Sequence, residues 1–211
     1  MPAEWNEDDP RDLRVIQSNL RLIVLQILKE APERIPPTVA LAQSWHRRIY
    51  QGVRLPVDYF AGEIRNSDSR FPELFGYEVI VGGHAGVASW EVPSELAALE
   101  VGLQQAVSNL DGVIPVGVLP KGTAELHAVL TLCAHAHGEW VRIHPFANGN
   151  GRTARLWANW CAARYRLPAF VQLKPRPDNV GYAAAAARSM TGDHWPMVAE
   201  LVAMLRDKQP Q

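Results

Sequence analysis

A short run of turn-forming residues separates two apolar helical stretches, and this break constrains the fold more than any other part of the sequence. Apolar residues recur at helical spacing as far as Trp140. Pro145 disfavours helix in the residue before it, so the first helix must end at about His144. A second helix is predicted from about Asn150 to Tyr165. The residues between them therefore form a tight connection between two helices.

The rest of the chain predicts a mainly helical fold with one small hairpin. The other helices are expected to start at Asp9-Pro10, Thr38, Ser94, near Asp178 and at Asp193. Residues 53–93 lack a helical period, and the stretch 78–92 reads as an irregular β-hairpin. Its first strand is Glu78 to Val81, its turn is Gly82-Gly83, and its return strand is predicted at 88–92.

Composition excludes several classes of protein. The 211 residues have a net charge of −1, so no nucleic-acid partner is indicated. No run approaches the ~18 apolar residues of a membrane span, and the acidic start of the chain is no secretory signal. Cys133 and Cys161 lie in apolar helical stretches and read as buried free thiols, which favours a reducing, cytoplasmic location.

The connecting segment, HPFANGNGRTAR at 144–155, joins groups that suit phosphate chemistry. Gly149, Asn150 and Gly151 precede or open a helix, where unpaired N–H groups and the helix dipole favour an anion. Arg152 and Arg155 share a helical face and add bidentate phosphate recognition. A histidine beside such a cradle suggests proton abstraction from a nucleophile that attacks phosphorus.

This string resembles the signature of the Fic (Fic/Doc) family: HxF, two variable positions, GNGR, two variable positions, R. The segments FAGEIR at 60–65, EVIVGG at 78–83 and GDHWPMVAEL at 192–201 also resemble landmarks of that family. The resemblance implies a Fic-like helical fold with a small β-hairpin flap beside the active-site loop. It divides the chain into an N-terminal helical extension, 1–37, and a Fic-like catalytic domain, 38–211.

The resemblance implies transfer of AMP from ATP to a Ser, Thr or Tyr hydroxyl of a target protein. His144 would be the base. Gly149, Asn150 and Gly151 would hold phosphate oxygens through backbone N–H groups and the Asn side chain, and Arg152 and Arg155 would bind the leaving pyrophosphate. Three further residues are expected to be structural: Pro145, Phe146 and His137.

The predicted hairpin is expected to align the target protein. An exposed strand edge can pair with an extended peptide and set its register without requiring a particular sequence. The residues expected to form this target-docking flap are Val79, Ile80, Val81, Gly82 and Gly83.

One departure from the family concerns the metal. The commonest signature has Asp or Glu where this chain has Asn148, and that carboxylate holds the Mg²⁺ that bridges the nucleotide phosphates. An amide oxygen lacks the charge, so Asn148 is expected to be a weak Mg²⁺ ligand. The histidines and Cys133 of the preceding helix lack zinc-site spacing, and no metal cluster is predicted there.

A second departure concerns regulation. Many family members carry a self-inhibitory helix that reads [ST]xxxE[GN]. The only [ST]xxxE here runs from Ser69 to Glu73 and contains Pro72, which argues against a helix. A separate antitoxin-like subunit, or no such regulation, is expected instead.

Two alternatives remain open from the sequence. The same histidine and anion loop would also serve transfer of phosphate, a choline phosphate or another nucleotide. The chain could also be a nucleotide-binding module whose catalytic site has decayed, although His144, Asn150, Arg152 and Arg155 are all intact.

Overall fold

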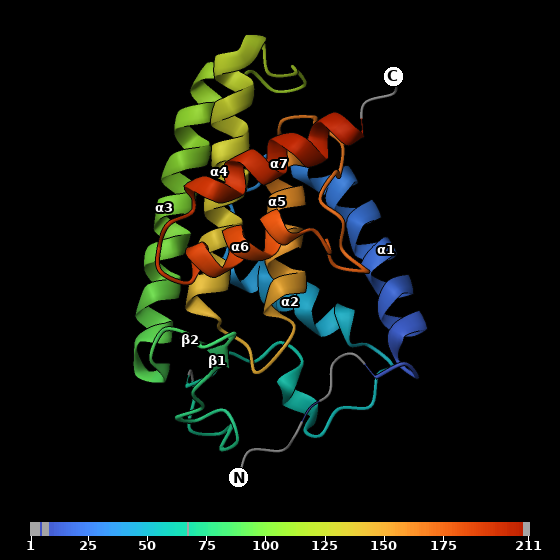
Figure 1. Cartoon of the computed structure of the whole chain (residues 1–211), viewed down its shortest axis with the longest axis vertical. Helices are drawn as coiled ribbons and strands as arrows, with labels where there is room; N and C mark the ends of the chain where they lie inside the picture. Colours follow the sequence, from blue (N-terminus) through green and yellow to red (C-terminus); the bar gives the residue numbers. More distant parts are fainter. Residues whose placement is uncertain (1–4, 6–8, 67, 209–211) are drawn as a thin grey trace.

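The computed structural model describes residues 5, 9–66 and 68–208. Within them, helices dominate and the only strands form a two-stranded antiparallel hairpin, with Ile80 opposite Ala85 and Val81 opposite His84. The fold is therefore mainly helical, as predicted (Figure 1). Its α-helices and strands are α1 Leu13–Glu30, α2 Val39–Ile49, β1 Ile80–Val81, β2 His84–Ala85, α3 Val92–Val113, α4 Gly122–Ile143, α5 Asn150–Arg164, α6 Val180–Ser189 and α7 Trp195–Asp207.

Helix α5 is the centre of the core. All of its residues except Gly151 are buried, although its composition is only moderately apolar. The ring of Trp157 lies 5.0 Å from that of Trp45 on α2 and 6.0 Å from that of Trp140 on α4. Helices α6 and α7 cross in front of α4 and α5 in Figure 1, and the hairpin lies at the end where α4 stops and α5 starts. Burial on every side fixes the position of the α5 N-terminus.

Helix α1 belongs to the same core. Its buried stripe, Ile16, Leu20, Ile23 and Ile27, joins one continuous apolar cluster with α2 and α5. The division of the chain at residue 37 stays a prediction from sequence. No helix of the described residues has the length and apolar character needed to cross a membrane.

Several predicted boundaries are wrong. Helix α1 begins at Leu13, not at Asp9-Pro10, because the Asp9 carboxylate accepts hydrogen bonds from Arg11 instead of capping the helix. The return strand of the hairpin is His84–Ala85, since the tight turn at Gly82-Gly83 pairs the chain at once. Residues 88–92, predicted as that strand, form a 3₁₀ turn and the start of α3.

Of the other predicted helix starts, those at Thr38 and Asn150 are confirmed, and those at Ser94 and Asp193 are wrong. Thr38 caps α2, its hydroxyl oxygen accepting the Leu41 N–H, and α5 starts at Asn150 as expected. Ser94 does not cap α3, which begins at Val92; its hydroxyl donates to the Glu91 carbonyl inside the first turn. Asp193 is not the N-cap of α7, which is His194; the Asp193 carboxylate lies one residue earlier and accepts the Trp195 N–H at 3.2 Å.

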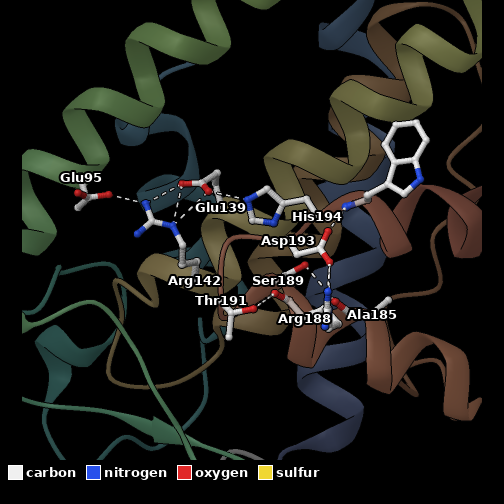
Figure 2. A network of polar contacts seen from close by, with 10 residues as sticks. Glu95, Glu139, Arg142, Ala185, Arg188, Ser189, Thr191, Asp193 and His194 are labelled. Carbon is white, nitrogen blue, oxygen red and sulfur yellow. Dashed lines mark hydrogen bonds and ion pairs between the residues drawn. The ribbon is translucent and has the colours of Figure 1, made fainter.

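A charged network holds α3, α4 and α7 together (Figure 2). Arg142 on α4 donates to Glu95 on α3 and to Glu139 one turn back, with 2.8 Å between Nη2 and Oε2 of Glu139. His194, at the start of α7, lies 2.5 Å from the other Glu139 oxygen. Burial raises the pKa of Glu139, but hydrogen bonds from His194 and Arg142 outweigh it and hold that pKa at about 2. The carboxylate is therefore the charged centre of the network.

The close approach of α7 to α4 depends on Gly138. A Cβ there would lie 2.2 Å from Nδ1 of His194, whose ring is held by Glu139. We expect Gly138→Ala to lower the free energy of unfolding by about 1–3 kcal/mol, because the clash outweighs the gain in helix propensity. Urea unfolding measures this.

Gly102→Ala in α3 is the matched control. No heavy atom lies within 4 Å of a Cβ at this position, so this variant should gain up to about 1 kcal/mol. In a His194→Ala background, the cost of Gly138→Ala should disappear. A cost that persists there would contradict the clash with His194 as its cause.

Candidate active site

His144 ends α4 in a left-handed backbone conformation, with φ 52° and ψ 57°. A residue other than glycine is strained there, so surrounding bonds must hold it. Its N–H donates to the Trp140 carbonyl, and its own carbonyl accepts from Arg65 at 2.7 Å. This turn swings the side chain out of the helix and into a cavity.

The hydrogen bonds of the imidazole select its tautomer. Nδ1 lies 3.0 Å from the Val141 carbonyl oxygen, an acceptor, so Nδ1 carries the proton and Nε2 keeps its lone pair. Burial lowers the pKa of His144 from 6.5 to about 4, and the nearby Arg65 guanidinium adds to this. The ring is therefore neutral at neutral pH. An anion beside it would favour the protonated form and make Nε2 a better proton acceptor.

The loop after His144 is closed by Asn150. The side-chain oxygen of Asn150 accepts the Phe146 N–H at 2.9 Å, and its amide nitrogen donates to the Phe146 carbonyl at 2.9 Å. One N–H of the amide is not used in these two bonds, so the phosphate contact expected from this side chain stays a prediction. Its role in the loop is to fix the curvature that brings His144 and the start of α5 together.

His46 on α2 supports the same loop from the other side. Its ring stacks on Phe146, with 3.8 Å between centroids. Nδ1 accepts the Gly62 N–H at 2.8 Å, so Nε2 donates to the Asn148 carbonyl at 3.0 Å. Phe146 is fully buried between this ring and the core.

The N-terminus of α5 has the features of an anion site. Gly149 precedes the helix with φ 75°, and the first N–H groups, those of Asn150 and Gly151, have no carbonyl partner within a helix. Arg152 and Arg155 are both buried and line the same cavity. Two tyrosines hold them: Arg152 donates to the Tyr50 hydroxyl at 2.7 Å, and Arg155 approaches the Tyr182 hydroxyl at 3.5 Å.

His137 takes part through Tyr182. Its Nε2 lies 2.8 Å from the Tyr182 hydroxyl, and it is fully buried. His137 therefore contacts Tyr182, which in turn approaches Arg155, and His137 does not line the cavity.

One cavity of about 590 Å³ collects these groups. Its size suits a nucleotide. Its lining residues are Leu13, Val81, Val141, His144, Asn148, Asn150, Gly151, Arg152, Arg155, Lys174, Pro175, Arg176, Asp178, Tyr182 and Ala186.

Arg65, which is fully buried, connects the hairpin to the turn at His144. Its guanidinium donates to the Tyr77 carbonyl on one flank of the hairpin and to the Val87 carbonyl on the other, at 2.7 and 2.6 Å. The same side chain binds the Ile143 and His144 carbonyls at 3.0 and 2.7 Å. The flap is therefore fixed relative to His144.

Both polar atoms of the Asn148 side chain make hydrogen bonds within the protein. Its side-chain oxygen accepts the Gly149 N–H at 2.9 Å, and its amide nitrogen donates to the Trp5 carbonyl at 3.2 Å. Among the described residues, no group of three or more His, Cys, Asp or Glu side chains could hold a metal ion. The expectation that Asn148 is a weak Mg²⁺ ligand stays a prediction.

A model of the Fic/DOC family matches residues 36–162, which is more than half of the chain. The chain belongs to the Fic/DOC family. A search of curated proteins gave no match.

Solved structures show the same fold. A Fic domain-containing signalling protein from Bacteroides thetaiotaomicron superposes with a TM-score of 0.67 at 21% identity, over 96% of this chain and 72% of that one. BepC of Bartonella tribocorum, solved with bound AMPPNP, gives 0.58 at 17% identity, over 96% and 89%. Fic-1 of C. elegans gives 0.63 at 20% identity, over 97% of this chain and 52% of that chain.

Four residues of this Fic fold were missed as site components by the sequence reasoning: His46, Tyr50, Arg65 and Tyr182. Each comes from an element distant in sequence from the signature. Only Arg65 lay in a segment already singled out, FAGEIR. A charged residue in a partly apolar stretch was the one available signal, and it does not reveal the partner.

The buried histidines predict acid sensitivity of folding. Burial lowers the pKa of His46 and of His137 from 6.5 to about 3. The unfolded chain therefore binds protons that the native state refuses, and stability falls as pH drops from 6.5 towards 3. Each histidine should cost about 1.4 kcal/mol per pH unit in this window.

Urea unfolding between pH 7 and pH 5 tests this. His137→Gln keeps a hydrogen-bonding group beside Tyr182 but cannot titrate, so its stability should fall less steeply than that of the wild type. Equal slopes for the two proteins would mean that His137 does not contribute.

Proposed function

We propose that this protein is a protein adenylyltransferase, which transfers AMP from ATP to a hydroxyl side chain of a target protein. One observation carries the proposal: the neutral Nε2 of His144 and the N-terminus of α5 open onto a single cavity with two buried arginines. A base and an anion site on the same cavity suit attack on phosphorus. Membership of the Fic/DOC family, and AMPPNP bound to BepC, support ATP as the donor.

The chain's own residues account for the reaction. A Ser, Thr or Tyr hydroxyl of the target would attack the α-phosphorus. As the new O–P bond forms, the hydroxyl proton passes to Nε2 of His144, and the bond to pyrophosphate breaks. Backbone N–H groups of Asn150 and Gly151 would neutralise charge on the α-phosphate. Arg152 and Arg155 would hold the leaving pyrophosphate.

Asn148 would contribute little to holding Mg²⁺, because it offers no charge and its oxygen already accepts one hydrogen bond. Nucleotide phosphates would supply the ligands of any Mg²⁺ at the site. The antitoxin-like inhibitor and the cytoplasmic location stay predictions.

The first experiment concerns His144. Replacing it by Ala should lower AMP transfer by roughly 10²–10⁴-fold, because the proton acceptor is lost, while ATP affinity changes little. ATP labelled on the α-phosphate, incubated with a cell lysate, reports transfer, and calorimetry reports binding.

His127→Ala is the matched control, since His127 is exposed and lies outside the cavity. Full transfer by the His144 variant would contradict the proposed role. Label from the γ-phosphate in place of the α-phosphate would identify a phosphotransferase. Binding without any transfer by the wild type would identify a decayed module.

The flap is proposed to align the target by strand pairing. Gly86 N–H donates to the Val79 carbonyl, so pairs 79–86 and 81–84 are hydrogen-bonded and the pair 80–85 is not. The backbone N–H and C=O of Ile80 therefore face away from β2, and its side chain is 77% exposed. This is the free edge that an extended peptide would join.

Ile80→Pro should cut target labelling strongly and leave ATP affinity unchanged, because it removes the N–H of the free edge. Ile80→Ala removes the side chain but keeps the N–H, and should retain more labelling. Measurements are label transfer and ATP titration. If the Pro variant lost both equally, the hairpin would be structural support only.

A further inference from the structure

The loop that follows α5 forms a wall of the cavity and carries its own cations. Residues 173–178, LKPRPD, contribute Lys174 and Arg176 to the lining. This loop lies beyond residues 36–162, which match the family. The signature and the family match therefore say nothing about what these two side chains do.

Helix α5 pins the start of this loop. The buried Asn159 donates to the Val171 carbonyl at 2.8 Å and accepts the Val171 N–H at 3.0 Å. Arg155 donates to the Leu173 carbonyl at 3.0 Å. The residue after that carbonyl is Lys174, so the cationic part of the loop starts directly beside the second signature arginine.

The cavity has an excess of positive charge that the whole protein lacks. Among the described residues that line it, Arg152, Arg155, Lys174 and Arg176 are cationic and Asp178 is acidic. The chain as a whole has a net charge of −1. Such a local excess favours a ligand with several negative charges.

The two signature arginines already serve the protein with part of their hydrogen-bonding capacity. Arg152 donates to Tyr50, and Arg155 donates to the Leu173 carbonyl and approaches Tyr182. A chain of three phosphates needs more donors and more charge than one phosphate, and Lys174 and Arg176 extend the cationic wall beyond Arg155.

We propose that Lys174 and Arg176 bind the terminal phosphates of the donor and thereby select a nucleoside triphosphate over a monophosphate. This inference rests on the proposed nucleotide-binding function. It assigns specificity to a segment outside the signature. Lys174 is half-buried and Arg176 is exposed, so both side chains can be replaced without opening the core.

Titration of ATP and of AMP into the protein by calorimetry separates recognition of the terminal phosphates from recognition of the rest. Lys174→Ala combined with Arg176→Ala should weaken ATP binding by about 10-fold or more, because two charge-assisted contacts are lost. AMP affinity should stay within about 2-fold of the wild type. Lys174→Ala combined with Arg176→Lys keeps the charge at 176, so this variant should bind ATP more tightly than the double alanine variant does.

Lys121→Ala combined with Arg206→Ala is the matched control, since it removes the same two charges outside the cavity. It should leave ATP and AMP affinities as in the wild type. The loop variant is the protein with Lys174→Ala and Arg176→Ala. An equal loss of ATP and AMP affinity in this variant, or an unchanged ATP affinity, would overturn the inference. So would an equal loss in the control variant, which would make the effect one of net charge.

A parallel assay of AMP transfer keeps the two proposals distinct. If the wild type favours ATP over AMP and the loop variant loses that preference, the inference stands whether or not AMP reaches a protein. If the wild type transfers AMP and the loop variant binds ATP equally well, the inference fails and the proposed function stands. A wild type that binds neither nucleotide would overturn both.

Discussion

The geometry of the site depends on a single buried guanidinium. Arg65 binds four carbonyls that belong to three separate segments: the end of α4, and the two flanks of the hairpin. Its own N–H donates to the Pro145 carbonyl at 2.8 Å. The partial charges of these carbonyls offset the cost of burying the cation, to which only the more distant Glu78, at 3.7 Å, adds a formal negative charge. Burial lowers the pKa of Arg65, yet the planar fork of donors still determines where each segment lies.

Neutral imidazoles and tyrosine hydroxyls complete what Arg65 begins. His46 fixes the loop backbone, and Tyr50 and Tyr182 orient the two signature arginines. These contacts keep both arginines on the lining of the cavity.

Helical periodicity and the signature were enough to predict the fold class, the start of α5 and the confluence of His144, Arg152 and Arg155 at one site. Contacts between distant segments could not be predicted, because the spacing of apolar residues along one helix does not reveal which other segments pack against that helix. The Asn150 side chain illustrates this: its residue type suits a phosphate, and only the fold shows that both of its polar atoms bind the loop backbone.

The Tyr50 hydroxyl limits whether the signature could be transferred to another protein. A Cβ at Gly149 would lie 2.3 Å from that hydroxyl, so the loop is shaped against a residue almost a hundred positions earlier in the chain. If the twelve residues 144–155 were grafted between two other helices, they would keep their sequence but lose the contact with Tyr50 that shapes the loop. The site therefore consists of several segments that cross in the fold, and the signature is only the one that is easiest to recognise in the sequence.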